Sequence, residues 1–428
     1  MCHAALLSIS LAIGSIASVS AAGAANVPIR WTEVRPPTSP SARTGPSLAA
    51  DPASEKVVLF GGSTHFGTTY LAETWTWDGA SWTEQHPPTS PPAREGAMIA
   101  TDPRSGHVVL FGGFGPLGNG FNGYLGDTWT WDGATWTAHA VPFGPPPRET
   151  GTMAADPTSG RVVLFGGFDG GATLADTWTW DGTTWTEQHP SASPPARAVG
   201  VMATDASRGV VLFGGIGGVA LGDTWTWDGA NWTQPHPPAS PPARGGAAIA
   251  TDPLTGRVVL FGGFDRSDTD LGDTWTWDGT TWTEEHPVPS PAARSFPNMA
   301  TDPEGRAVLF GGFDRRDNFD DTWSLTPSLS ISPRRGAPGA LVTVRGLGYT
   351  SGASVVVEYH TSPRARSVIC STRVGTPASA TGFSCSARIP TEPAAGRTGP
   401  HIFTATDSTG LQSATIFTLS RRKRAPLP

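Results

Sequence analysis

Residues 57–62 read Val-Val-Leu-Phe-Gly-Gly, residues 73–82 read Glu-Thr-Trp-Thr-Trp-Asp-Gly-Ala-Ser-Trp, and six near-copies of this pair of phrases fill residues 43–325. The Gly pairs, which recur 51, 54, 48, 48 and 49 residues apart, are Gly61-Gly62, Gly112-Gly113, Gly166-Gly167, Gly214-Gly215, Gly262-Gly263 and Gly311-Gly312. A period near fifty residues with several short strands is typical of propeller blades. The repeat predicts a fold more strongly than a function, because one fold serves many functions.

Each repeat is expected to form a four-stranded sheet. The apolar run Val57–Phe60 suits a strand that is covered on both faces. In residues 74–77 threonine and tryptophan alternate, so both tryptophans point to one face of a strand, and Asp78-Gly79 supplies a hairpin turn. In the second repeat the expected strands are residues 96–101, 107–112, 128–131 and 135–139.

The tryptophans indicate how the ring of sheets closes. Of the 17 tryptophans, sixteen lie in the repeats, and the other, Trp31, begins a Trp-Thr-Glu phrase like that at Trp82. The sixth repeat ends near Leu325 without its own fourth strand. We therefore expect residues 31–35 to complete the sixth blade of a propeller that spans residues 25–326, because stacked sheets in a closed ring leave few open edges.

The recurring Gly-Gly and Trp motifs at this period resemble kelch repeats, in the form seen in secreted bacterial proteins. The resemblance covers roughly residues 31–326 and implies a six-bladed β-propeller within an all-β chain. Propellers of this family are most often used for binding, and a few are oxidases.

The beginning of the chain predicts export. Residues 4–19 are apolar but short for a membrane span, and Ala22-Gly23-Ala24 follows as a cleavage signal. Residues 1–24 are therefore expected to be a signal peptide. The leading segment has only His3 where a Lys or Arg is usual, so the sequence does not decide whether Met1 is the true start. No other apolar run is long enough to span a membrane, so we expect a secreted, extracellular or cell-surface protein.

Residues 327–420 differ in composition from the repeats. They contain no tryptophan, and short alternating segments separated by Gly and Pro predict a β-sandwich. The expected strands are residues 341–345, 354–359, 367–370, 382–389, 401–406 and 413–419. The run from Ser332 to Thr350 resembles the opening of a bacterial immunoglobulin-like domain of the IPT (TIG) type, which implies an immunoglobulin-like sandwich.

The exported chain would hold two cysteines, Cys370 and Cys385, on successive expected strands. An adjacent pair in a secreted domain is most simply a structural disulfide. The alternative is a pair of buried thiols.

Charge is unevenly distributed. Residues 1–326 carry 17 Lys and Arg against 33 Asp and Glu, whereas residues 327–428 carry 12 against 3, and the chain has a net charge of −7. An acidic propeller is a poor nucleic-acid binder, so no nucleic-acid partner is expected. The basic tail, residues 421–428, is either a contact to an anionic surface such as cell-wall polymer or headgroups, or a solvated segment.

The order of the two expected domains resembles that of galactose oxidase. That family holds copper with tyrosines and histidines, one tyrosine being cross-linked to a cysteine. Here the propeller has no cysteine and only Tyr70 and Tyr124 as tyrosines. A copper-radical oxidase is therefore disfavoured, because the ligand set is missing.

A recurring arginine precedes each Gly pair by 17 or 18 residues. The six are Arg43, Arg94, Arg148, Arg197, Arg244 and Arg294. At the start of each first strand they would form a channel ring that could hold an anion. A structural role is favoured instead, in which each arginine pairs with backbone carbonyls or with the repeated carboxylates Glu73, Asp127, Asp176, Asp223, Asp273 and Asp321.

The loops after the Gly pairs vary from seven to thirteen residues and are the expected ligand-binding face. One arc is aromatic and polar: His65, Phe66, Tyr70, Phe114, Phe121, Asn122 and Tyr124. The arc expected opposite is charged: Asp169, Asp265, Asp268, Asp270, Asp314, Asp317 and Asn318. Residues 265–270 suit either Ca²⁺ or a solvated acidic loop; no other cofactor and no metal site is expected.

These features favour a binding or interaction protein that recognises a glycan, a cell-wall polymer or a protein at the bacterial surface through the propeller loops. One alternative is an exported carbohydrate-active hydrolase or lyase using residues such as Asp265 and Asp314. Another is a structural or adhesion component. No catalytic residue is assigned, because no Ser-His-Asp spacing, HExxH motif or phosphate loop is present.

Overall fold

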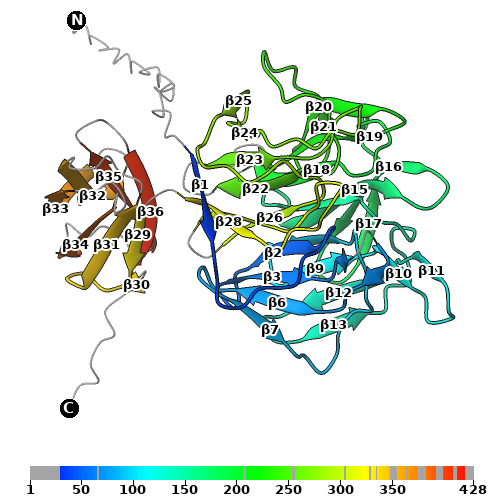
Figure 1. The fold of residues 1–428 in the computed structure, drawn as a ribbon, viewed down its shortest axis with the longest axis horizontal. Coiled ribbons are helices and arrows are strands. Elements are labelled where there is room, and N and C mark those ends of the chain that lie inside the picture. Colours follow the sequence, from blue (N-terminus) through cyan, green and yellow to red (C-terminus); the bar gives the residue numbers. More distant parts are fainter. Residues whose placement is uncertain are drawn as a thin grey trace, which may run out of the picture.

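The computed structural model describes residues 29–419, apart from residues 65–66, 206–208, 253–255, 303–304, 327–328, 334, 348–353, 363–364, 374–381, 392–398 and 408–411. The fold is all-β (Figure 1). The described part of the chain offers no helix with the length and hydropathy needed to span a membrane. The expected signal peptide and the basic tail lie outside the described residues.

Six four-stranded antiparallel sheets account for the repeats. The first sheet contains β2 (Ser47–Asp51), β3 (Lys56–Phe60), β6 (Thr74–Trp77) and β7 (Trp82–Gln85). The second contains β8 (Met98–Thr101), β9 (Val108–Phe111), β12 (Thr128–Trp131) and β13 (Trp136–His139). The third contains β14 (Thr152–Asp156), β15 (Arg161–Phe168), β16 (Thr173–Trp180) and β17 (Trp185–Gln188).

The remaining sheets follow the same order. The fourth contains β18 (Val201–Asp205), β19 (Gly209–Ile216), β20 (Ala220–Trp227) and β21 (Trp232–Thr233). The fifth contains β22 (Ala248–Asp252), β23 (Arg257–Phe261), β24 (Thr274–Trp277) and β25 (Trp282–Glu285). The sixth contains β26 (Asn298–Thr301), β27 (Ala307–Phe310), β28 (Thr322–Thr326) and β1 (Arg30–Val34).

The second strand of each sheet is buried on both faces, as its apolar run predicts. Val57 and Leu59 pack into one core cluster with residues of the sixth sheet, while Val58 and Phe60 pack into another with the second sheet. All four side chains are at most 1% exposed. The VVLF run therefore joins each sheet to both neighbours, which is why a single sheet could not be stable alone.

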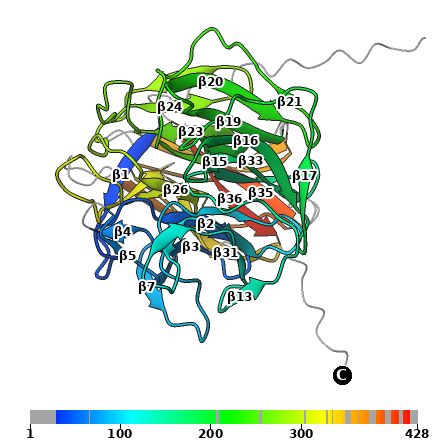
Figure 2. The same ribbon diagram turned by 90° about the vertical axis from the view of Figure 1, so that its right-hand side faces the viewer.

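The six sheets form a closed ring. The first strands of neighbouring sheets contact one another all the way round, from β2 through β8, β14, β18 and β22 to β26 and back to β2. Seen along the axis of the ring, the sheets surround a common centre (Figure 2). β1 pairs with β28 from Arg30–Thr326 to Val34–Thr322, so the start of the described chain supplies the outer strand of the last sheet.

Two short hairpins extend the first two sheets after the Gly pairs. They are β4 (Ser63–Thr64) with β5 (Thr69–Tyr70), and β10 (Phe114–Pro116) with β11 (Asn122–Tyr124). The second hairpin grows from the longest of the six loops and projects at the end of the molecule opposite the C-terminal unit (Figure 1).

Beyond residue 328 lies a separate β unit with two sheets. One contains β29 (Leu329–Ser332), β31 (Leu341–Leu347) and β34 (Gly382–Arg388). The other contains β30 (Arg335–Gly336), β36 (Gln412–Leu419), β35 (Gly399–Asp407), β32 (Ser354–Ser362) and β33 (Ala365–Arg373). Buried residues of both sheets, such as Val344, Val357 and Phe403, share one apolar core.

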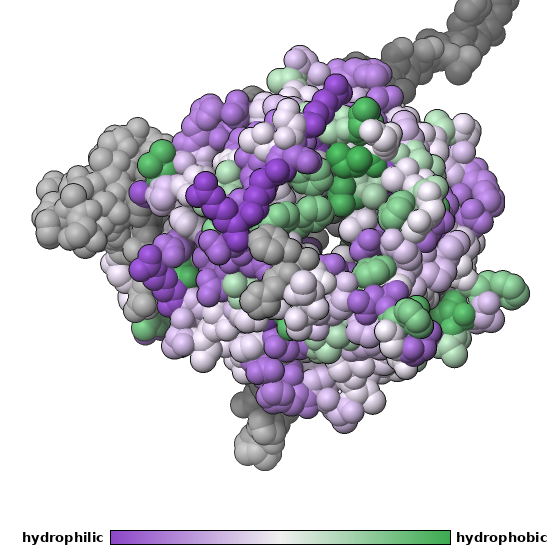
Figure 3. Space-filling model, turned by 45° about the vertical axis from the view of Figure 1, so that its right-hand side comes forward, coloured by the Kyte–Doolittle hydropathy of each residue, from purple (hydrophilic) through white to green (hydrophobic). Residues whose placement is uncertain are grey.

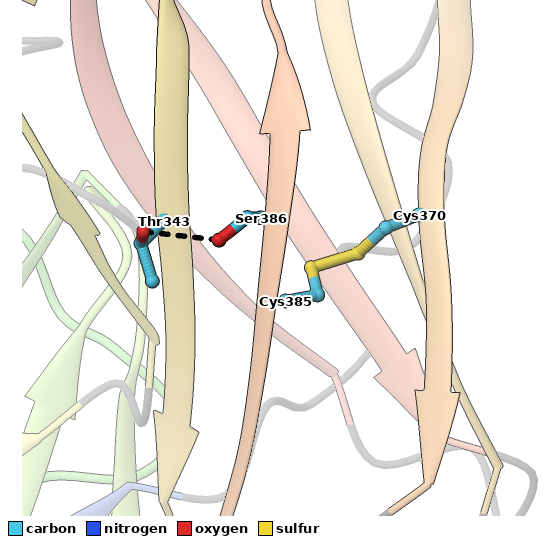
Figure 4. Close-up of a disulfide and its surroundings, with 4 residues drawn as sticks. All are labelled: Thr343, Cys370, Cys385 and Ser386. Atoms are coloured by element: carbon cyan, nitrogen blue, oxygen red, sulfur yellow. Dashed lines mark hydrogen bonds between the residues drawn. A yellow bond between two sulfur atoms is a disulfide. The ribbon is translucent and has the colours of Figure 1, made fainter.

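A disulfide between Cys370 and Cys385 joins β33 to β34 (Figure 4). These strands lie at the edges of the two different sheets, so the bridge fastens one sheet to the other. On the far side of β34, the hydroxyls of Thr343 and Ser386 are 3.2 Å apart (Figure 4). The predicted disulfide is therefore present.

The C-terminal unit contacts the ring at the turn between β2 and β3. The guanidinium of Arg335 lies 2.5 Å from the carboxylate of Glu55 in that turn. The turn is at the end of β2 away from Gly45, so the face that carries the loops after the Gly pairs is turned away from the C-terminal unit (Figure 1).

Candidate binding site at the mouth of the central channel

The first strands enclose a narrow channel of about 250 Å³. Its described lining consists of Gly, Ala, Thr, Met and other uncharged residues. One level of the wall is a ring of alanines: Ala49, Ala100, Ala154, Ala203, Ala250 and Ala300. Short side chains at this level are required because six strands approach one axis. The channel itself offers no charged group for chemistry among the described residues.

The six recurring arginines do not line this channel, which corrects their expected position, and they make the structural pairs with the repeated carboxylates that the sequence favoured. All six, namely Arg43, Arg94, Arg148, Arg197, Arg244 and Arg294, are at most 1% exposed. Arg148 is typical: it donates to both carboxylate oxygens of Asp176 at 2.6 Å, to Gly166 O at 3.0 Å and, through Nε, to Pro146 O at 3.0 Å. The guanidinium thus joins the connection before the third sheet to the second and third strands of that sheet, β15 and β16.

The partner carboxylate is held just as firmly. Asp176 also accepts the indole Nε1 of Trp178 at 2.7 Å. Burial alone would raise the pKa of Asp176, but the hydrogen bonds and charge of Arg148 outweigh it and hold the pKa below its usual value. In the first sheet Glu73 replaces the aspartate, and Arg43 makes a single bond to it at 2.6 Å. These pairs are structural, and they leave no free guanidinium for an anion.

A closed ring of backbone hydrogen bonds surrounds the mouth of the channel. The residue two places after each arginine donates its N–H to the carbonyl of its counterpart in the preceding sheet, at 2.7–3.3 Å. Round the ring these residues are Gly45, Gly96, Thr150, Val199, Gly246 and Phe296. All six have positive φ, between 50° and 61°. Thr150, Val199 and Phe296 adopt this unfavourable conformation because the ring of hydrogen bonds requires it.

A cup of about 440 Å³ opens on this mouth, on the face turned away from the C-terminal unit. Figure 3 shows the hollow, with hydrophobic residues along part of its rim. Its described lining is Thr44, Gly45, Gly67, Glu95, Gly96, Glu149, Thr150, Phe168, Ala198, Val199, Phe296 and Phe313. One side of the cup is therefore acidic and another side is apolar.

Glu95 and Glu149 follow the recurring arginines directly, and the fold fixes them at the mouth. Each makes a two-hydrogen-bond bridge to the aromatic residue after a Gly pair, Glu95 with Phe114 and Glu149 with Phe168, at 2.9–3.0 Å. Glycines leave room for the carboxylates: a Cβ at Gly96 would lie 3.4 Å from Oε2 of Glu149. The two carboxylates thus occupy adjacent positions of one ring.

The two carboxylates repel one another. Burial, and then the charge of Glu95, raise the pKa of Glu149 to about 7. Burial also raises the pKa of Glu95, and a hydrogen bond from the hydroxyl of Ser63 offsets part of that increase. No hydrogen bond or ion pair to the Glu149 carboxylate occurs among the described residues. Near neutral pH, Glu149 is therefore divided between its charged and neutral forms.

A row of aromatic rings flanks the carboxylates. Tyr70, Phe114, Tyr124 and Phe168 follow one another edge to face, with centroids 5.9, 5.0 and 5.8 Å apart. Burial, and then the nearby carboxylates, raise the pKa of Tyr70 and of Tyr124, so both phenols stay neutral. This row contains three members of the aromatic arc expected from the sequence, and it adds Phe168.

A second aromatic cluster forms the apolar side. Phe296 lies 5.5 Å from Phe264 and 5.9 Å from Phe313, and its plane is within 16° of that of Phe313. Because Phe296 belongs to the hydrogen-bonded ring, this cluster reaches the centre of the mouth. None of these three phenylalanines was among the expected site residues.

Other expected residues lie further out. Phe121 and Asn122 are exposed at the β10–β11 hairpin, where Phe121 is 72% exposed. His65 and Phe66 lie outside the described residues. Asn318 donates to Ser63 O at 3.4 Å, and Tyr124 packs on Phe168 beside Asp169. The two arcs therefore adjoin at both ends, while the charged loop of the fifth sheet lies across the ring from the aromatic hairpin of the second.

Three of the expected aspartates stabilise turns. Asp169, Asp265 and Asp314 each accept two backbone N–H groups from the residues that follow, at 2.8–3.1 Å. These hydrogen bonds lower the pKa of each, so they are charged acceptors and not proton donors at neutral pH.

The other acidic residues belong to the loops of the last two sheets. Arg315 lies 3.8 Å from Asp268 and 3.7 Å from Asp270, and Asp270 also accepts the hydroxyl of Ser295. Asp317 is exposed. The part of the chain that the structure describes contains no group of three His, Cys, Asp or Glu side chains placed to hold a metal ion.

Sequence reasoning overlooked Glu95 and Glu149. The residue after each recurring arginine is Thr44, Glu95, Glu149, Ala198, Gly245 or Ser295. Only two of these six residues are charged. Comparing the repeats at this one position would have identified Glu95 and Glu149, whereas comparing the variable loops does not.

Residues 80–237 match the family described as the KLHDC2/KLHL20/DRC7 kelch-repeats domain. A solved structure, "Structure of YjhT", has a similar fold, with a TM-score of 0.54 and 13% sequence identity over 72% of this chain and 99% of that chain. At this identity the likeness concerns the fold alone. No curated protein sequence matches the chain. Together with the four-stranded sheets, these matches support a kelch-type β-propeller fold for the repeats, and the described part of the chain is all-β.

Proposed function

We propose, from the premise that the repeats form a kelch-type propeller, that this chain is a binding protein whose ligand enters the cup at the channel mouth. One observation carries the proposal: the cup combines two carboxylates with an apolar wall on the face turned away from the C-terminal unit. Ligand sites are typically concave and largely apolar, with a few polar groups. Kelch propellers most often serve as interaction scaffolds, which agrees with this function.

The finer architecture belongs to the same proposal. The six sheets would be six blades of one propeller, and the C-terminal unit an immunoglobulin-like sandwich of the IPT type. The chain would be exported by residues 1–24 and act outside the cell or at its surface. There the sandwich would keep the cup directed outward, toward a glycan, cell-wall polymer or protein.

A second candidate, an exported hydrolase or lyase, is favoured by one feature of the same cup. Glu149, with its pKa raised to about 7 beside Glu95, has the protonation state that a general acid needs. Asp265 and Asp314, the residues considered from the sequence, carry no such feature because their pKa values are lowered.

A screen of the full chain against glycans, cell-wall polymers and secreted proteins tests the proposal. The variant Phe296→Ala removes one ring of the apolar wall, and the variant Phe121→Ala, at the outer hairpin, is its control. Hits that F296A loses and F121A keeps support binding in the cup. Hits that both variants keep would contradict the cup as the site. Turnover of a hit that E149Q abolishes, with binding retained, would favour the enzyme.

A further inference from the structure

We propose that the cup takes an organic ammonium group, such as a primary amine on an apolar or sugar stem, held between Glu95 and Glu149 with its stem on Phe296 and Phe313. This inference rests on the proposed function, since it names the ligand class of the same cup. It follows from the charge and the shape of the site, and from its poor fit to a metal ion.

The charge of the cup is unbalanced. Among the described lining residues, two are acidic and none is basic. The nearest arginines along the chain, Arg94 and Arg148, are already paired, with Asp127 and Asp176 at 2.6 Å. A carboxylate pair without a counter-charge in a half-buried site is costly, and a bound cation offsets that cost.

The hydrogen-bonding capacity is also unused. Among the described residues, Ser63 donates to one oxygen of Glu95, and no side chain donates to the other Glu95 oxygen or to either Glu149 oxygen, so these three oxygens are open to a ligand. A primary ammonium has three N–H donors and no acceptor, so it matches a group of acceptors that has no donor of its own. A neutral alcohol has one donor and would leave more of these oxygens unsatisfied.

The opposite wall suits the rest of such a ligand. Val199 and the stacked rings of Phe296 and Phe313 offer a flat apolar surface for a hydrocarbon or sugar stem. Phe168 lines the cup beside Glu149, where an aromatic ring attracts a cation. A volume of about 440 Å³ lies within the roughly 300–1,000 Å³ usual for small-molecule sites.

A hard metal ion fits less well. Calcium takes about six to eight oxygen ligands, and magnesium needs a nearly ideal octahedron. Within the described ranges no three acidic, His or Cys side chains converge, at the cup or elsewhere. Two carboxylates surrounded by phenylalanines supply too few oxygen ligands to replace the water around an inorganic ion, so they favour an organic cation.

Calorimetry on the full chain with benzylamine and benzyl alcohol tests the inference. These probes share a ring and differ in charge. At pH 8 and low salt we expect benzylamine to bind at least about tenfold more tightly than benzyl alcohol. Glu95→Gln and Glu149→Gln should each weaken benzylamine about tenfold and leave benzyl alcohol unchanged. Glu187→Gln, on the outer strand β17, is the matched control and should change neither.

Proton counting gives an independent measurement. Because a bound ammonium favours the charged carboxylate, benzylamine should release protons from the wild type near pH 7. Titrations in buffers of different ionisation enthalpy measure this release, and E149Q should abolish it. Melting curves of each variant establish that it is folded, so a loss of binding is not a loss of structure.

Equal binding of the two probes, no detectable benzylamine binding, or unchanged binding in E95Q and E149Q would each overturn the inference. The proposed function fails separately. If glycan or protein hits depend on Phe296 and are indifferent to both Glu→Gln changes, the cup is a binding site but not for ammonium. If hits are indifferent to all three residues, both proposals fail.

Discussion

The indole Nε1 of Trp31 donates to Oγ1 of Thr274 at 3.1 Å, across 243 residues of sequence. The same bond recurs at every other junction: Trp82 to Thr322, Trp136 to Thr74, Trp185 to Thr128, Trp232 to Thr177 and Trp282 to Thr224. In each case a fourth-strand tryptophan reaches a third-strand threonine of the preceding sheet. Trp31 supplies the one bond that the last repeat cannot make from its own sequence.

Removing this residue should therefore open the ring. Trp31 is fully buried and packs on Phe261 with a centroid separation of 5.6 Å. We expect Trp31→Ala to cost about 3–5 kcal/mol of unfolding free energy, and deletion of residues 26–36 to lower the melting temperature further. Trp31→Phe keeps a ring and loses the hydrogen bond, so its cost should be smaller. An unchanged melt on deletion would contradict closure by β1.

The buried ion pairs predict a second effect on stability. Asp176→Asn keeps the shape of the side chain and leaves the Arg148 guanidinium buried without its charged partner. We expect a loss of about 3–5 kcal/mol in denaturant unfolding, because a buried charge without a partner is costly. Asp169→Asn, at an exposed turn in the same repeat, is the control and should cost less than about 1 kcal/mol.

Glu149 predicts a pH dependence. Its pKa is about 7 in the folded protein against a usual value of 4.5, so the folded state holds this proton more tightly than the unfolded state. Its contribution to stability is therefore greatest at low pH, and is lost as the pH rises from about 4.5 to 7. E149Q should be more stable than the wild type above pH 7, by about 1–2 kcal/mol after solvent screening.

Unfolding of both proteins from pH 5 to pH 8 measures the difference between them. Subtracting one curve of unfolding free energy against pH from the other cancels the contributions of all titratable groups that both proteins share. A constant difference over this range would mean that the carboxylate is not perturbed in the folded protein.

Close approach of neighbouring sheets makes some glycines irreplaceable. A Cβ at Gly112 would lie 2.5 Å from Arg148 O, whereas a Cβ at Gly106 would meet nothing within 4 Å. Both residues have positive φ, 66° and 74°. The backbone strain of a Gly→Ala change is therefore similar at both positions, and only Gly112 adds a steric clash. We expect G112A to lower the melting temperature much more than G106A does. Similar melts for the two variants would contradict the close approach.

The disulfide should stabilise the C-terminal unit alone. Cys370 and Cys385 are 15 residues apart, and closing such a loop contributes about 3 kcal/mol. The double variant Cys370→Ser and Cys385→Ser should unfold this unit earlier, with the melting of the propeller unchanged. Differential scanning calorimetry resolves two transitions if they are independent. Reactive thiols at both Cys370 and Cys385 in the denatured, unreduced wild type would contradict the bridge.

Much of the fold was predictable because the pattern repeats. The VVLF run requires cover on both faces, and only stacked sheets provide it. The strand phrases predicted the strands to within a few residues: in the second repeat, residues 128–131 were expected and β12 spans Thr128–Trp131. The structural role of the arginines was predictable too, because a buried guanidinium needs a carboxylate and carbonyls, and each repeat offers both. Their expected place in the channel wall was wrong, since none of the six lines the channel.

The sequence by itself determined the repeat and the strands within it, because these depend on local pattern and on the need to bury apolar faces, and it predicted the pairing of two cysteines that the structure shows. Only the tertiary structure brought Glu95 beside Glu149 and placed Phe296 at the same mouth. Those residues come from different repeats, and the ring of hydrogen bonds that joins Gly96, Thr150 and Phe296 exists only after six sheets close on one axis. Contacts between repeats depend on that closure, so the cup could not be predicted from any repeat alone.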